Sequence, residues 1–88
     1  MIVRFWEARV VDGRLDEVIA WARTVLLPAA MDAGAFGVEV VSSPADAPTK
    51  NPPRVVVLMR FASDRGFEEP AIDTTIVDRA HAWNFFAA

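Results

Sequence analysis

The side chains best suited to chemistry gather in the last ten residues, "RAHAWNFFAA". This stretch holds the single histidine of the chain, His81, close to Trp83 and Asn84. Histidine is the side chain whose ordinary pKa lies nearest neutrality, so His81 is the candidate catalytic base. The alternative is a histidine at the rim of a strand without a chemical role, because no acidic residue flanks it in the sequence.

Polar and aromatic residues elsewhere are candidates for binding a small aromatic molecule. These substrate-binding candidates are Trp6, Arg60, Trp83 and Asn84. Tryptophans can wall a pocket for a flat ligand, or pack in a core or an interface. Arg60 and Asn84 interrupt apolar runs, and a buried polar group needs either a local partner or a ligand. For Arg60, an ion pair with Glu7 or Glu39 is the structural alternative.

The composition excludes several classes of site and partner. The chain has no cysteine and one histidine, so we expect no disulfide, no metal site and no cofactor. The net charge of -3 gives no basic patch for nucleic acid. The N-terminal run "MIVRFWEARV" carries an Arg and a Glu, and it has neither the apolar core of a signal peptide nor the length of a membrane span. We therefore expect a cytoplasmic protein with no membrane partner.

Residues 1–88 are expected to form one domain, since a chain of this length buries one small core. Its apolar patterns predict four strands and one long helix. The strands are expected over 2–11, 36–42, 54–62 and 81–87. The helix is expected over 15–33, with a kink near 23–27 caused by Pro28 and an end at Gly34.

Two connections are less regular. The proline-rich stretch 43–53 predicts the most mobile internal loop, either a lid over a site or a tolerated insertion. Residues 64–79 contain Gly66, Pro70 and a β-branched run, and they are read as two short helices over 64–69 and 72–79.

The order β, α, β, β, α, β predicts an α+β, ferredoxin-like βαββαβ fold. Its antiparallel four-stranded sheet has the order 4-1-3-2 and carries both helices on one face. The run 55–59 has no polar residue, and 53% of the chain is hydrophobic. A second apolar sheet face needs a cover, so we expect a homodimer formed through the helix-free face.

The chain resembles the dimeric α+β barrel superfamily, in particular its antibiotic-biosynthesis-monooxygenase-like branch. The resemblance lies in "MIVRFWEARV", "DGRLDEVIAWARTVLLPAAMDAGAFGVEV", "RVVVLMRFAS" and "AHAWNFF". It implies two sheets packed face to face and a pocket between each sheet and its helices. The haem-degrading members use an Asn on the first strand and the quinone-forming members use a Tyr. The expected first strand lacks Asn and the chain lacks Tyr, so neither activity can be transferred by residue.

The expected function is that of a small cofactor-independent, monooxygenase-like enzyme acting on a small aromatic substrate. The alternative is a non-catalytic small-molecule-binding dimer, or an accessory dimer with a structural role. We expect the terminal strand to pair with the first strand and its aromatic residues to serve packing. On that view Trp83→Ala costs about 3–5 kcal/mol of stability, and His81→Ala costs little.

Overall fold

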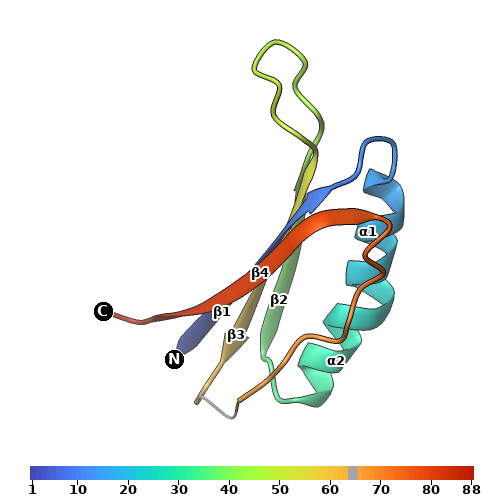
Figure 1. The fold of residues 1–88 in the computed structure, drawn as a ribbon. Helices are drawn as coiled ribbons and strands as arrows, with labels where there is room; N and C mark the ends of the chain where they lie inside the picture. Colours follow the sequence, from blue (N-terminus) through green and yellow to red (C-terminus); the bar gives the residue numbers. More distant parts are fainter. Residues whose placement is uncertain (64–65) are drawn as a thin grey trace.

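The computed structural model describes residues 1–63 and 66–88. It shows an α+β chain with one helical segment lying against one face of a four-stranded sheet (Figure 1). The strands are β1 (Ile2–Val10), β2 (Gly37–Ser43), β3 (Arg54–Phe61) and β4 (Val77–Phe86). The helical segment consists of α1 (Leu15–Trp21), η1 (Ala22–Leu26) and α2 (Leu27–Asp32).

The sheet is antiparallel throughout, and its strands lie in the order β2-β3-β1-β4. Read from the β4 edge, this is the predicted order 4-1-3-2. The predicted pairing of the terminal strand with the first strand is confirmed, with Trp83 opposite Phe5. The helical segment covers one face of the sheet, and no described element covers the other (Figure 1). We call this uncovered side the open face.

The helical segment changes its winding where Pro28 was expected to disturb it. A π-helical stretch, η1, directly precedes α2, and Pro28 lies in the first turn of α2. Proline lacks an N–H and its ring crowds the carbonyl of the preceding turn, so a widened turn there relieves the clash. Gly34 adopts φ 100° just after α2, a left-handed conformation that glycine accepts without strain and that ends the helix.

The second helical region predicted from the sequence is wrong. Residues 66–76 run as an extended segment with a turn at its end, and β4 then begins at Val77. Gly66 and Pro70 disfavour a helix, and Asp73 accepts the Thr75 N–H at 2.8 Å, which fixes a turn instead. Asp64 and Arg65, the start of the expected 64–69 helix, lie outside the described residues.

The core lies between the sheet and the helical segment. Along β3 the side chains alternate between fully buried and half-buried positions. The buried positions face the helical segment, with Val18, Ala22, Leu26 and Ala30 fully buried opposite them. Val56 and Leu58 point to the open face and are only half-buried in the single chain. The second apolar face of the 55–59 run is therefore not covered within one chain.

The 43–53 stretch forms a protruding hairpin end (Figure 1). Asp46 and Asn51 pair in a β-bridge, and Thr49 Oγ1 donates to Asp46 Oδ2 at 2.7 Å. This hairpin leads into β3 at Arg54, the first residue of the strand. Phe61, the last residue of β3, lies at the opposite end of the sheet.

Candidate functional site

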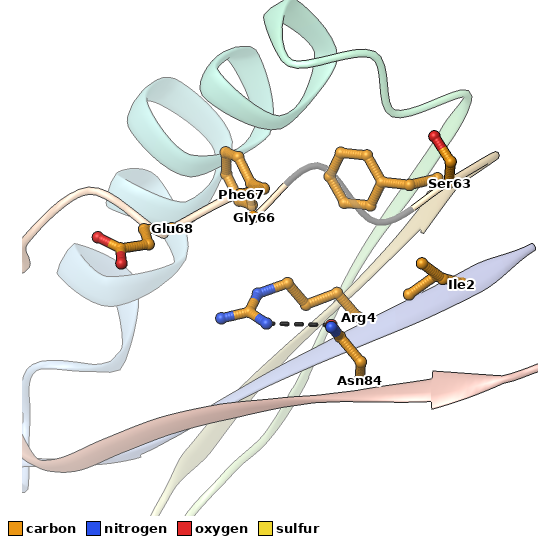
Figure 2. Close-up of a pocket in the computed structure, with 8 residues that line it drawn as sticks. Ile2, Arg4, Ser63, Gly66, Phe67, Glu68 and Asn84 are labelled. Carbon is orange, nitrogen blue, oxygen red and sulfur yellow. Dashed lines mark hydrogen bonds between the residues drawn. The ribbon is translucent and has the colours of Figure 1, made fainter.

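A cavity of about 280 Å³ lies at the Phe61 end of the sheet, on the side of the helical segment (Figure 2). Its wall is formed by the ends of three strands and by the segment that replaces the second helix. The lining residues are Ile2, Arg4, Phe61, Ser63, Gly66, Phe67, Glu68 and Asn84. Ligand pockets typically begin near 300 Å³, so this cavity suits a small molecule.

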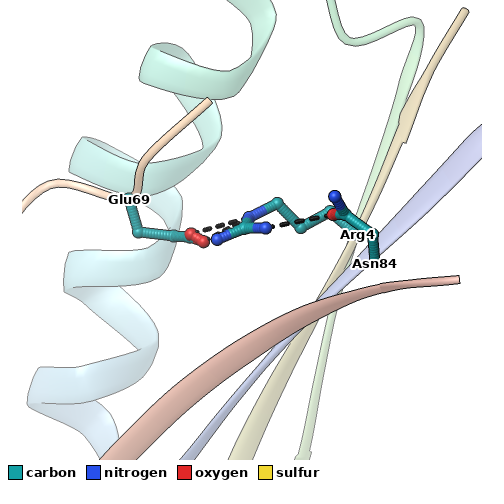
Figure 3. Close-up of polar contacts among 3 residues, drawn as sticks. All are labelled: Arg4, Glu69 and Asn84. Atoms are coloured by element: carbon teal, nitrogen blue, oxygen red, sulfur yellow. Dashed lines mark hydrogen bonds and ion pairs between the residues drawn. The ribbon is translucent and has the colours of Figure 1, made fainter. Parts of the chain in front are cut away.

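Neighbouring strands position the polar side of the cavity. Arg4 on β1 and Asn84 on β4 are partners in the sheet register, so their side chains lie next to each other. Arg4 Nη1 donates to Asn84 Oδ1 at 3.0 Å, and Arg4 Nε donates to both Glu69 carboxylate oxygens, at 2.5 and 2.9 Å (Figure 3). The side chains of Arg4 and Glu69 are only 20% and 7% exposed. The partly buried charge of Arg4 is therefore compensated before any ligand arrives.

Aromatic rings form the apolar side. The rings of Phe61 and Phe67 lie 5.4 Å apart at an angle of 35°. Ile2 is buried beside them at 7% exposure. Glu68 also lines the cavity, and it forms no ion pair with any described residue. The arrangement can hold a flat ring against apolar walls while one polar group faces Asn84. The Glu68 carboxylate lies at the edge and is directed away from Arg4 and Asn84 (Figure 2).

Two of the predicted site residues lie on this side of the sheet. Asn84 lines the cavity, as its position in an apolar strand suggested. Trp6 lies deeper, at 4% exposure, and its ring packs on Trp21 with centroids 5.3 Å apart. Trp6 is thus placed as a core residue, which was the packing alternative.

The other predicted site residues lie on the open face. His81 stacks on Trp83, with ring centroids 4.9 Å apart and planes 14° from parallel. Its Nε2 lies 3.8 Å from Glu7 Oε1, which is too far for a hydrogen bond. Glu7 is the cross-strand partner of His81 in the register. The acidic neighbour missing from the local sequence is thus supplied by the sheet.

Arg60 also points to the open face, but the predicted ion pair with Glu7 or Glu39 is wrong among the described residues. The register places Arg60 opposite Val3 and Gly37, four residues along β1 from Glu7. Arg54 approaches Glu7 instead, with Nη1 and Oε1 3.9 Å apart. The Arg60 stem lies over Gly37, where an added Cβ would be 3.7 Å from Arg60 Cδ.

The five predicted site residues therefore do not meet at one place, because alternate strand positions point to opposite faces. The cavity adds Arg4, Phe61, Phe67 and Glu68, and Glu69 holds Arg4 in place; none of these was a candidate from the sequence. Arg4 carried a usable signal, since it shares a strand face with Ile2 and Trp6 and so interrupts an apolar row. Glu69 carried none, because its partner is 65 residues away in the chain.

In the parts of the chain that the structure describes, no three His, Cys, Asp or Glu side chains lie close enough together to hold a metal ion. No helix formed by the described residues has the length and apolar character needed to span a membrane. Comparisons with protein-family models, curated proteins and solved structures find no match for this chain.

Proposed function

We propose that this protein is a homodimeric, dimeric α+β barrel-type protein of ferredoxin-like topology that binds a small aromatic molecule in each subunit. The observation that carries the binding function is the cavity beside Arg4 and Asn84. It combines two tilted phenylalanine rings, a partly buried arginine already paired with Glu69 and the amide of Asn84 around a volume of about 280 Å³.

The chemistry of the lining defines the ligand. Arg4 is already engaged by Glu69, so the cavity offers little attraction to an anion. Asn84 presents an amide and Glu68 a carboxylate, which accepts hydrogen bonds. A phenol-like molecule satisfies this arrangement, because its ring packs on Phe61 and Phe67 while its hydroxyl donates to an oxygen of the lining.

A homodimer is supported by the open face. Trp83, Phe85 and Val41 are exposed there by 38%, 52% and 44%, although large apolar side chains are more often buried. Phe5 packs between Trp83 and Phe85, with ring centroids 4.7 and 6.2 Å away. Glu39 and Arg60 flank this apolar centre without an ion-pair partner among the described residues. A second copy related by a two-fold axis covers the apolar centre and brings opposite charges into reach.

A catalytic function, cofactor-independent oxidation of the bound aromatic molecule by oxygen, is the second candidate. Glu68 favours it, since its exposed carboxylate lies at the edge of the cavity and, once its side chain rotates inward, can take the proton of a phenol and make the ring more electron-rich. His81 lies on the open face, away from the cavity, so in this proposal it packs on Trp83 at the dimer interface and has no catalytic role. Glu68 takes the place of the general base first assigned to His81.

Calorimetric titration with para-cresol tests the binding function. We expect saturable binding at one site per chain, and weaker binding of the saturated ring analogue 4-methylcyclohexanol. Asn84→Ala should weaken binding about tenfold through loss of a buried polar contact. Asn51→Ala, in the exposed hairpin, is the matched control and should bind as the parent does.

Absence of para-cresol binding, or equal loss in the two asparagine variants, would contradict the proposed site. Oxygen uptake with para-cresol then separates the two candidates. Uptake that disappears in Glu68→Gln supports the enzyme, whereas binding without uptake supports the non-catalytic binder.

A further inference from the structure

Three arginines form a row across the end of the open face nearest the 43–53 hairpin. Arg9 on β1 is the register partner of Arg54 on β3 and of Arg79 on β4. All three therefore occupy equivalent positions on adjacent strands. Neighbouring strands lie about 4.8 Å apart, so three guanidinium groups can converge on one small anion. We call these residues the arginine row.

The row is unfavourable in the absence of a counterion. Like charges placed directly opposite each other in a sheet are destabilising. Arg9 and Arg79 form no ion pair with any described residue, and Arg54 has only Glu7, at 3.9 Å. Asp78 follows Val77 next to a register shift and lines a separate hollow with Val10 and Asp12.

The local charge is opposite in sign to that of the molecule. Three arginines and Glu7 sum to +2 if His81 is neutral, whereas the whole chain carries -3. Residues that break a local rule of stability are expected at functional sites. Among anions, a diphosphate group matches the row, because it offers several oxygens to planar guanidinium forks across a span of two strand spacings.

We propose that the arginine row is a binding site for a diphosphate-bearing small molecule. Arg9, Arg54 and Arg79 hold the phosphate oxygens. Glu7, two residues before Arg9 on β1 and on the same face, orients Arg54. Four residues separate Arg9 from Phe5, about 13 Å along the strand. The row thus lies beyond the aromatic rings of the apolar centre, at the hairpin end of the open face next to Val41. This inference is independent of the aromatic cavity.

Calorimetric titration with inorganic pyrophosphate at low salt tests the proposal. We expect saturable binding to the parent chain and at least about tenfold weaker binding to Arg9→Gln and to Arg79→Gln. Arg23→Gln is the matched control, because Arg23 is exposed on the helical segment and belongs to no ion pair among the described residues. Circular dichroism and light scattering on each variant verify the fold and the oligomeric state.

Failure of pyrophosphate to saturate the parent would overturn the proposal. So would equal weakening by Arg23→Gln, which would indicate general attraction to positive charge. A single-stranded oligonucleotide without diphosphate that binds more tightly than pyrophosphate would assign the row to nucleic acid and overturn it as well.

Discussion

At the scale of single residues, Arg4 connects the sheet to the segment that closes the cavity. Its guanidinium joins Asn84 on β4 to Glu69 on the 66–76 segment (Figure 3). Hydrogen bonds to charged groups contribute more than neutral ones, and a buried charge that loses its partner is costly. Arg4 and Glu69 therefore hold the cavity wall in place as a unit.

Glu69→Gln should lower the free energy of unfolding by about 2 kcal/mol, because Arg4 loses the charged partner of a nearly buried pair. Glu68→Gln, at the next residue, is the control and should change stability by no more than about 0.5 kcal/mol, since Glu68 is exposed and unpaired among the described residues. Urea unfolding of both variants beside the parent measures the difference. Equal effects of the two substitutions would show that Arg4 does not depend on Glu69.

Asp73 is the residue whose acidity the fold changes most clearly. Hydrogen bonds from the Thr75 backbone N–H and then from its hydroxyl lower the pKa of Asp73 below its ordinary value, with a smaller effect of Arg14. Because the folded pKa is depressed, this contribution to stability is present above the ordinary carboxyl range and is lost as the pH falls through the folded value.

NMR titration of the Asp73 carboxyl should therefore show a pKa below the ordinary value of an aspartate. Thr75→Val removes the hydroxyl donor and keeps the backbone donor, so it should raise the pKa part of the way back. Thr24→Val is the control, because Thr24 bonds to the Ala20 carbonyl on the helical segment. An unchanged Asp73 pKa in Thr75→Val would contradict this assignment.

At the scale of elements, the π-helical stretch η1 supplies part of the core as well as the change of winding. Ala22 and Leu26 on η1 are fully buried, whereas Val25 is 38% exposed. Leu26→Ala should therefore reduce the free energy of unfolding by about 3 kcal/mol through cavity formation. Val25→Ala, one residue away, should cost clearly less, and thermal unfolding of the two variants compares them. A larger loss in Val25→Ala would show that η1 packs with a different face.

The strands and the helical segment were predictable because the sequence patterns that indicate them are local. Apolar runs rich in β-branched and aromatic residues marked all four strands, and Pro28 marked the irregular turn. The 66–76 segment failed as a prediction because its structure depends on long-range contacts. Arg4 holds Glu69 from β1, and Val11 N–H donates to the Ile76 carbonyl at 3.0 Å.

The candidate site was only partly predictable for the same reason. Asn84 was recognised as a polar residue in an apolar strand, and it does line the cavity. The division of the other candidates between two faces follows from register, which no single sequence segment fixes. The strand register places Glu7 opposite His81, which the sequence alone did not indicate. The same register places Val3 rather than Glu7 opposite Arg60.

At the scale of the whole molecule, the two faces of the sheet differ in what they present. The side of the helical segment holds the core and the cavity, and the open face carries an aromatic centre with the arginine row beyond it. Trp83 is 38% exposed in the single chain. Its ring packs on Phe5, His81 and Phe85 within the chain, and we propose that a second chain covers the rest. An obligate interface of this kind buries on the order of 2,000 Å² or more.

Light scattering at micromolar concentration tests the homodimer most directly. We expect a mass twice the 9.7 kDa of the chain. Trp83→Glu should shift the mass towards the monomer, because it places a charge at the apolar centre of the interface. Met31→Glu is the control, since Met31 is 49% exposed on the helical segment and should leave the dimer intact. A parent chain that scatters as a 9.7 kDa monomer would contradict the account.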